Sequence, residues 1–432
     1  MGGEGGPVRA FLLNLIVLSL ATYPFVDMRL EVAAIRVPYS TILLPVLAFA
    51  CLLRLVFRRF RPAYPPVLLL AIAGLYLSML VPVSLGAAPD WEWMVRYGIF
   101  FLIPLFLPLA IESLSSLRLT IVALLSVGLF LAIYGYCLFF DKRLGYYDLH
   151  YTESTRNGDA ALMSAFLMLA LAYSFWGQGR KGRVPASLIL TVLFGSAVLL
   201  SFSRGVWLGV GAGLLSLAYF RCRQTFFVRH PKRKLAALGV LFGVFIFAIP
   251  QESWLQLSRR FTSIAGLSGH PEVSNQERRE LYASCAAIVA WEGWAGTGVR
   301  NFGNVLRKRL PHFRLQHAHN GYLNMWAEQG VMGLIAYLVV TFYPIRILAR
   351  SLLERSWTPQ TWVFSGLLSI AITWTISSLF DTLYFGFYYW LVYGIITSAA
   401  LLCSQAPAAG PPFRGKGARN SADGLFTVRC LP

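Results

Sequence analysis

The chain has 432 residues, of which 57% are hydrophobic and only 13% are charged, and its mean hydropathy is +0.60. A soluble globular protein carries about a quarter charged residues to solvate its surface, so this composition excludes that class. The net charge of +19 does not by itself indicate nucleic acid, because the cytoplasmic loops of membrane proteins are enriched in Lys and Arg.

Apolar segments of about 20 residues, long enough to cross a hydrocarbon core, recur along the chain. They predict an all-α integral membrane protein with about twelve transmembrane helices. The first segment lacks an Ala-x-Ala-like cleavage site, so we expect a retained helix rather than a signal peptide. The predicted spans are 8–26, 38–57, 66–86, 94–111, 119–140, 159–177, 184–202, 205–220, 235–250, 320–345, 360–380 and 385–403.

Positive charges in the short loops set the expected orientation. An even number of spans puts both termini on one side, and a cytoplasmic assignment places the most basic short loops inside. We therefore expect a multi-pass protein of the bacterial inner membrane with a transmembrane domain over 1–403. The tail 404–432 is rich in Pro, Gly and Ala, and we expect it to be cytoplasmic and disordered. The inner basic loops include Arg54/Arg58/Arg59/Arg61, Arg180/Lys181/Arg183 and Arg221/Arg223/Arg229/Lys232/Arg233/Lys234.

The segment 251–319, between spans nine and ten, is the one long loop of this topology and is expected to face the periplasm. It holds nine Lys and Arg against five Glu, although positive charge on that side does not help to set the topology. Two explanations stay open. The loop binds anionic lipid headgroups, or it forms a site for an anionic, phosphorylated substrate at the outer leaflet.

A capping box, Ser274-Asn275-Gln276-Glu277, predicts the start of a helix within this loop. Arg278 lies on the apolar face of that helix, and Arg279 lies at the edge of the same face. An arginine that points inward near a helix N-terminus requires an anionic partner. That partner is either a substrate phosphate or a neighbouring acidic residue such as Glu277 or Glu280.

Two further cations occur at predicted outer ends of helices. Arg204 lies in a tight turn between two spans, so its guanidinium must lie at the membrane boundary or inside the bundle. An ionisable group there indicates a functional site, unless the side chain only extends to the interface. Arg156-Asn157, at the start of span six, is a weaker case of the same kind.

The long loop ends in Gln316-His317-Ala318-His319-Asn320, where the chain re-enters the membrane. His317 and His319 could ligate a metal with His270 or His312. However, His-x-His is a weak metal signal, and no Asp or Glu lies within ten residues upstream. We therefore expect no metal. An imidazole can also accept or donate a proton near neutral pH, and His319 stands at the outer end of a predicted helix.

Glu328 is a carboxylate inside the same predicted span. It lies nine residues beyond His319, which is about 2.5 turns and ~13 Å along the helix axis. Glu328 therefore points to the opposite face and does not orient His319. We expect it to pack or to bend the helix near Gly330 and Gly333.

Four stretches of the chain each carry a short sequence motif. The turn Ser201-Phe202-Ser203-Arg204-Gly205 is similar to a Ser-Arg-Gly turn, and Arg278 is followed four residues later by an aromatic residue. The stretch 296–302 matches Gly-x-Gly-x-x-Asn-Phe, and 319–333 matches His-Asn-x-x-Leu…Glu-x-Gly-x-x-Gly. In this order, the stretches resemble the O-antigen ligase and polymerase superfamily, and specifically the lipopolysaccharide O-antigen ligases.

The resemblance implies a glycosyltransferase with a GT-C-like membrane architecture. Such a ligase transfers O-antigen polysaccharide from undecaprenyl diphosphate to a sugar hydroxyl of lipid A–core at the periplasmic face. The implied partners are this donor, this acceptor and membrane lipids, with no nucleic acid.

Under this hypothesis, arginines bind the donor diphosphate and stabilise the departing charge. His319 orients the acceptor hydroxyl or removes its proton for a direct attack, which inverts the anomeric carbon. A diphosphate is a good leaving group, so no metal or other cofactor is required. The expected catalytic residues are His319, Arg278 and Arg204, the diphosphate-binding residues are Arg204, Arg278, Arg279 and Arg300, and the supporting residues are Asn320, Arg156, Asn157 and His317.

Three other functions stay open. An O-antigen polymerase uses the same donor chemistry, but the Arg-x10-Gly spacing of such polymerases is absent from 251–319. A protein O-oligosaccharyltransferase is not excluded by the sequence. A transporter of lipid-linked oligosaccharide would show paired repeats and broken helices at mid-bilayer, and no convincing repeat is found.

Overall fold

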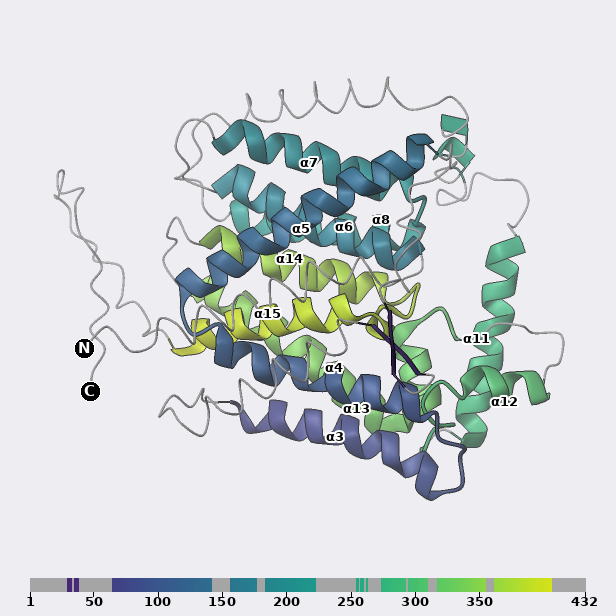
Figure 1. Ribbon diagram of the computed structural model, residues 1–432. Coiled ribbons are helices and arrows are strands. Elements are labelled where there is room, and N and C mark those ends of the chain that lie inside the picture. The colour runs from purple at the N-terminus through teal and green to yellow at the C-terminus, as the bar shows by residue number, and fades with distance from the viewer. Residues whose placement is uncertain are drawn as a thin grey trace, which may run out of the picture.

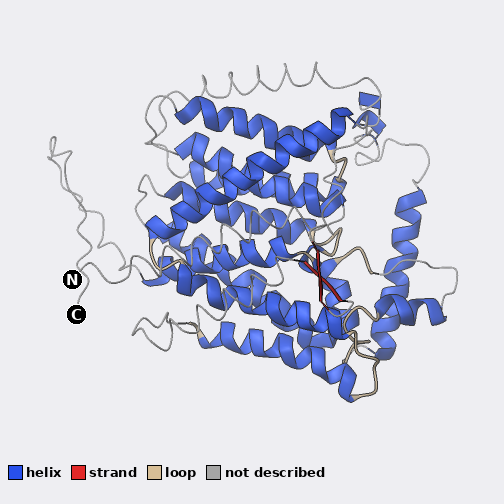
Figure 2. Ribbon diagram, in the orientation of Figure 1, coloured by secondary structure: helices blue, strands red, loops and turns tan. Residues whose placement is uncertain are grey.

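The computed structural model describes residues 29–32, 35–38, 64–141, 156–176, 183–222, 254–255, 257–259, 262, 273–292, 294–309, 317–354 and 361–405. These residues are almost entirely helical (Figure 1, Figure 2). The exception is an antiparallel pair of short strands, β1 (Arg29–Val32) and β2 (Ile35–Pro38), in which Leu30 pairs with Val37. The all-α prediction holds for the other described elements, and it did not foresee this ladder, in which apolar and charged residues alternate with the two-residue period of a strand.

The described residues contain nine apolar helices, and each coincides with a predicted span. Six are long and apolar enough to cross a membrane, and α7, α8 and α14 are shorter. A helical membrane protein is therefore confirmed. Almost all of the predicted spans 8–26, 38–57 and 235–250, and the tail beyond 405, fall outside the described residues. The nine are α3 (Pro66–Ser84), α4 (Trp91–Ala110), α5 (Leu114–Asp141), α6 (Arg156–Trp176), α7 (Arg183–Leu200), α8 (Arg204–Cys222), α13 (Gly321–Glu354), α14 (Thr361–Ser377) and α15 (Phe387–Gln405).

The helices α14 and α15 form the centre of the bundle, and nearly all of their residues are buried. α14 packs on α6 and α8, while α15 packs on α4 and α13. Gly205, Gly209 and Gly213 recur every four residues along α8. A Cβ at Gly209 would lie 2.4 Å from the carbonyl oxygen of Thr373 in α14. Small residues thus let the two backbones approach closely, which places Arg204, at the start of α8, beside the end of α14.

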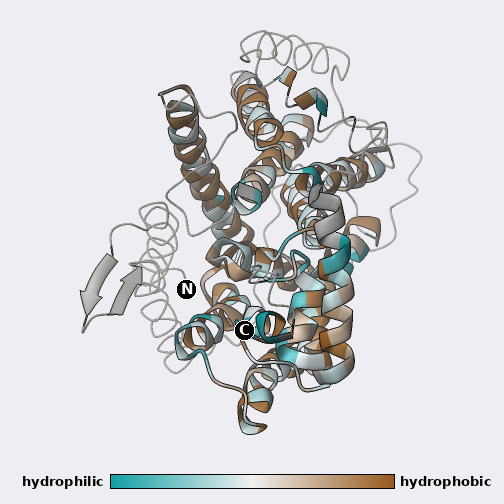
Figure 3. Ribbon diagram, turned by 90° about the vertical axis from the view of Figure 1, so that its right-hand side faces the viewer, coloured by the Kyte–Doolittle hydropathy of each residue, from teal (hydrophilic) through white to brown (hydrophobic). Residues whose placement is uncertain are grey.

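Two further helices, α11 (Val273–Glu292) and α12 (Phe302–Arg309), are more polar than the bundle helices. They lie beyond one end of the bundle (Figure 1). We call this the loop end, since α4, α6, α8, α13 and α15 begin there. The helix predicted from the capping box is confirmed by α11. Figure 3 looks onto this side of the molecule and shows apolar colour over most of the helical ribbon, with hydrophilic colour limited to short stretches.

The helix α13 is broken at Gly330, which has φ 69°. At the break, the carbonyl oxygens of Ala327 and Glu328 accept the N–H groups of Thr297 and Gly298, both at 2.8 Å. A Cβ at Gly330 would lie 2.3 Å from the carbonyl oxygen of Trp294, so this close approach requires glycine. The bend expected near Glu328 is therefore present, and it attaches residues 294–301 to α13.

Candidate active site

The turn that follows α14, residues 378–382, collects segments that are far apart in the sequence. Gly205 packs so closely against it that a Cβ there would lie 2.4 Å from a side chain of the turn. From α11, the hydroxyl of Tyr282 donates to a backbone carbonyl of the same turn at 3.4 Å. Arg204 precedes Gly205, and Arg278 lies one helical turn before Tyr282. The turn therefore brings two of the predicted arginine positions to one place.

His319 lies against the same turn. The N–H of Gly321 donates to the carbonyl oxygen of Ser378 at 2.7 Å and holds the start of α13 there. Nδ1 of His319 lies 3.6 Å from Oδ1 of Asp381, whose side chain is 6% exposed. This distance is long for a hydrogen bond, so the contact is electrostatic. The sequence did not predict Asp381 as a site residue.

Asp381 is a buried carboxylate in an unusual electrostatic setting. Burial on its own would raise the pKa of its carboxyl. The neighbouring imidazoles of His319 and His317, together with the N–H of Thr382, outweigh burial and bring the pKa of Asp381 to about 2. The carboxylate is therefore ionised at neutral pH. A fixed negative charge beside an imidazole holds the ring and stabilises the imidazolium that forms on proton uptake.

His317 fills the space between His319 and the aromatic Phe385. Its ring centroid lies 4.1 Å from that of His319 and 5.8 Å from that of Phe385. Its Nδ1 lies 3.4 Å from the hydroxyl oxygen of Thr382. Burial, aided by the positive charges of His319 and Arg300, lowers the pKa of His317 to about 4. His317 is therefore neutral at physiological pH.

Arg300 forms the other wall of this cluster. Its guanidinium lies 4.3 Å above the ring of Trp93 at the start of α4 and 4.8 Å above that of Phe385. Aromatic faces attract a guanidinium without using up its N–H donors. The part of the chain that the structure describes places no carboxylate within ion-pair distance of Arg300. The aromatic faces thus hold the guanidinium in place, and the buried carboxylate of Glu328 interacts with it electrostatically.

Backbone strain marks the same loops. Among the described residues, three that are not glycine have positive φ: Phe202 at 52°, Arg300 at 58° and His319 at 47°. Each belongs to a different motif loop around the site. Such conformations cost about 1–3 kcal/mol each and persist where the surroundings fix them, most often at active sites.

Not every predicted site residue joins the cluster. Arg204 is half-buried, whereas Arg279 is exposed on α11. The side chains of Arg278 and Arg156 lie outside the part that the structure describes. Asn157 is half-buried in the first turn of α6, a helix that contacts the 3-10 helix η2 (Leu383–Phe385) beside the site.

Asn320 has a structural position. Its Oδ1 accepts the N–H groups of Tyr322 at 3.0 Å and Leu323 at 3.1 Å. It therefore caps the N-terminus of α13 and satisfies two donors that a helix end leaves open. This cap holds the helix start directly after His319.

The cluster also contains the residues that could hold a metal ion. One donor atom each from His317, His319 and Asp381 lies within 4.8 Å of the other two. No Asp or Glu lies within ten residues upstream of the histidines, but the turn after α14 brings the carboxylate of Asp381 beside them. Two imidazoles and a carboxylate suit several divalent metals.

Residues 188–338 match a family model described as O-antigen ligase. This match confirms the resemblance to the O-antigen ligase and polymerase superfamily. The matched region contains the motif loops around Arg204, Arg300 and His319, and it ends before Asp381. No curated protein matches the chain.

Proposed function

We propose that this protein is a lipopolysaccharide O-antigen ligase. It transfers polysaccharide from undecaprenyl diphosphate to lipid A–core at the periplasmic face of the bacterial inner membrane. The observation that carries the proposal is the pairing of His319 with the buried Asp381, 3.6 Å apart, next to the aromatic-held guanidinium of Arg300. A base and a cation for an anionic leaving group occupy one end of a membrane bundle.

The donor side of the reaction needs positive charge around a diphosphate. Arg300 offers a planar set of N–H donors that matches phosphate oxygens. Arg204, at the start of α8, and Arg278, in the first turns of α11, are the other two arginines of this proposed donor site. These arginines bind the donor and stabilise the negative charge that develops on the diphosphate as it leaves. With this compensation, the reaction proceeds without a metal.

The acceptor side needs a base for one hydroxyl. His319 removes the proton from the acceptor hydroxyl, whose oxygen forms a bond to the anomeric carbon of the donor. The bond from that carbon to the diphosphate oxygen breaks on the opposite face, so the configuration inverts. Asp381 is a positioning residue, because it acts on the imidazole and not on substrate. Its ionised carboxylate stabilises the imidazolium that results.

This chemistry requires that the loop end face the periplasm. The helices α11 and α12, which belong to the segment predicted as the periplasmic loop, lie at that end (Figure 1). The proposed orientation leaves both termini in the cytoplasm. Single cysteines introduced into α12 and near Glu354 would test this orientation. A membrane-impermeant thiol reagent added from the periplasmic side should label only the cysteine in α12.

The activity is tested by mixing the purified protein with lipid-linked O-antigen and rough lipopolysaccharide, with and without a chelator. A ladder on lipid A–core supports a ligase, and the chelator should leave the ladder intact. Growth of the glycan on the lipid carrier alone would instead indicate a polymerase. Transfer to an added acceptor protein would indicate a protein O-oligosaccharyltransferase, and translocation without transfer a transporter. Loss of the ladder on chelation, with recovery on adding a divalent metal, would overturn the metal-free mechanism.

A further inference from the structure

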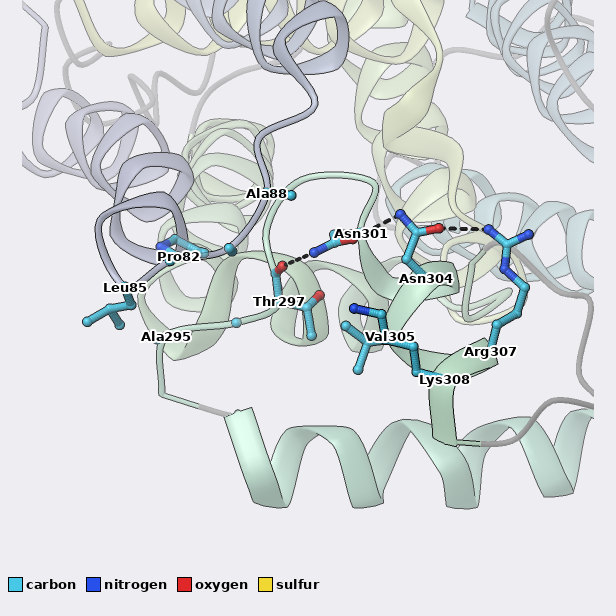
Figure 4. Close-up of a pocket in the computed structure, with 13 residues that line it drawn as sticks. Pro82, Leu85, Ala88, Ala295, Thr297, Asn301, Asn304, Val305, Arg307 and Lys308 are labelled. Carbon is cyan, nitrogen blue, oxygen red and sulfur yellow. Dashed lines mark hydrogen bonds between the residues drawn. The ribbon is translucent and has the colours of Figure 1, made fainter.

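A second concave site lies at the loop end, outside the His319 cluster. It is a cavity of about 720 Å³ between the end of α3 and helix α12. Figure 4 shows its lining, with Pro82 and Leu85 on the α3 side and Asn304, Arg307 and Lys308 on α12. Nothing in the chemistry described above uses this cavity.

The polar side of the cavity is an ordered chain of hydrogen bonds. Arg307 Nη2 donates to Asn304 Oδ1 at 2.7 Å, and Asn304 Nδ2 donates to Asn301 Oδ1 at 3.0 Å. Asn301 Nδ2 then donates to the carbonyl oxygen of Thr297 at 2.8 Å. These bonds hold two amides and a guanidinium in place, and each keeps further hydrogen-bonding capacity.

The charge of the cavity has one sign. Arg307 and Lys308 stand on its α12 side, and both are exposed. None of the described residues that line it is acidic. Two cations without a carboxylate favour an anion, and fixed amides favour a ligand with several hydroxyl groups. A phosphate-bearing sugar combines both features.

The surroundings indicate that this sugar is carried by an amphiphile. Trp294 and Trp291, which lie next to the cavity in sequence, are 69% and 57% exposed, and Leu85 on its rim is 58% exposed. Tryptophan is enriched where the bilayer meets water. A molecule with an acyl portion in the membrane could therefore place its headgroup in the cavity.

The cavity shares one loop with the proposed active site. Asn301 lines the cavity, and its neighbour Arg300 packs on the aromatic wall of the His319 cluster. The loop itself is fixed to the broken α13 through Thr297 and Gly298. A saccharide held in the cavity would therefore lie beside the reacting groups while leaving the diphosphate-binding arginines free.

We propose that this cavity binds a phosphate-bearing sugar of the membrane-anchored acceptor. The inference rests on the proposed ligase function, since it assigns the acceptor its own subsite. Arg307 and Lys308 bind the phosphate, and the amides of Asn301 and Asn304 bind hydroxyl groups. The donor diphosphate does not use this subsite.

The test compares three forms of the full-length protein in nanodiscs of zwitterionic lipid: wild type, the double variant R307Q/K308Q, and R259Q. Arg259 is a matched control, because it is an exposed cation of the same long loop that does not line the cavity. The probes are rough lipopolysaccharide, the same material after removal of its phosphates, inorganic phosphate, and nanodiscs that contain phosphatidylglycerol. Binding is measured as Kd, and ladder formation gives KM for the acceptor and kcat.

We expect R307Q/K308Q to raise the Kd for phosphorylated lipopolysaccharide by roughly tenfold or more, since charge-assisted bonds to phosphate are lost. KM for the acceptor should rise in parallel, while kcat, donor binding and the R259Q variant stay at the wild-type level. Dephosphorylated lipopolysaccharide should bind weakly and equally to all three forms.

Three results would overturn the subsite. The first is an unchanged Kd in the double variant, and the second is an equal loss in R259Q. The third is displacement of lipopolysaccharide by inorganic phosphate or phosphatidylglycerol alone, which would assign the cavity to free phosphate or to lipid headgroups. The two proposals fail separately. If the wild type forms no ladder but the double variant shows the expected rise in Kd, only the ligase activity is refuted. If the wild type forms a ladder and the double variant keeps the wild-type KM for the acceptor, only the subsite is refuted.

Discussion

Replacing Asp381 with Asn should slow transfer strongly while leaving the fold intact. The amide has the same shape as the carboxylate, but it removes the negative charge 3.6 Å from His319 Nδ1. At an effective dielectric constant of ~20, a unit charge at that distance stabilises an imidazolium by about 4.6 kcal/mol. If the whole effect is realised in the transition state, kcat falls by roughly 10³-fold. Because the pKa of Asp381 is about 2, its carboxylate is ionised throughout the range from pH 6 to pH 8.

The assay is single-turnover ladder formation with lipid-linked O-antigen and rough lipopolysaccharide at saturating donor. Glu92→Gln is the matched control, since Glu92 is an exposed carboxylate at the same end of the bundle that pairs with Arg96 at 2.7 Å. We expect Glu92→Gln to keep the wild-type kcat and Asp381→Asn to keep the wild-type donor affinity. An Asp381→Asn protein that transfers at the wild-type rate would refute the positioning role of this carboxylate.

Four other changes have defined outcomes. His319→Ala should abolish ligation while donor binding persists; ligation by the purified variant would rule out His319 as the base. Arg300→Lys should lower kcat over KM for the donor by roughly 10²-fold, because the planar guanidinium is lost. Arg96 also lies over the Trp93 ring, at 4.9 Å, and Arg96→Lys should leave kcat over KM nearly unchanged. Gly330→Ala should destabilise the protein by roughly 2–4 kcal/mol through positive φ and overlap, seen as a lower thermal midpoint, whereas Gly211→Ala, with nothing within 4 Å of its Cβ, should not. The pKa of His317 is about 4 in the folded protein against an ordinary 6.5. The unfolded state therefore binds one more proton between these pH values, and the free energy of unfolding decreases as the pH drops from 6.5 to about 4. His317→Gln should reduce that decrease in unfolding scans, and an unchanged pH dependence would contradict this prediction.

The sequence by itself determined the features that depend on local patterns. Apolar segments of membrane-spanning length predicted all nine bundle helices that the structure describes, because each segment must satisfy its own backbone hydrogen bonds in lipid. The capping box, with Ser274 as N-cap, predicted the start of α11 within two residues. A bend was expected near Glu328, and the structure places the break at Gly330, where φ is positive. The short β1–β2 ladder was missed, because its four-residue strands lie below the window of a membrane-span search.

Only the tertiary structure decided which side chains meet. Asp381 is 62 positions beyond His319, and no spacing rule connects residues at that separation. A partial signal existed, since Asp381 is the one acidic residue between 361 and 405 and follows a span expected to end on the same side as His319. The contact itself depends on the packing of α13 and α14, which brings Gly321 to Ser378. The two rings that contact Arg300 likewise come from separate segments, Trp93 from α4 and Phe385 from the link before α15. Charge and motif order are local properties of a chain, whereas the distance between a base and its carboxylate is set by how its helices pack.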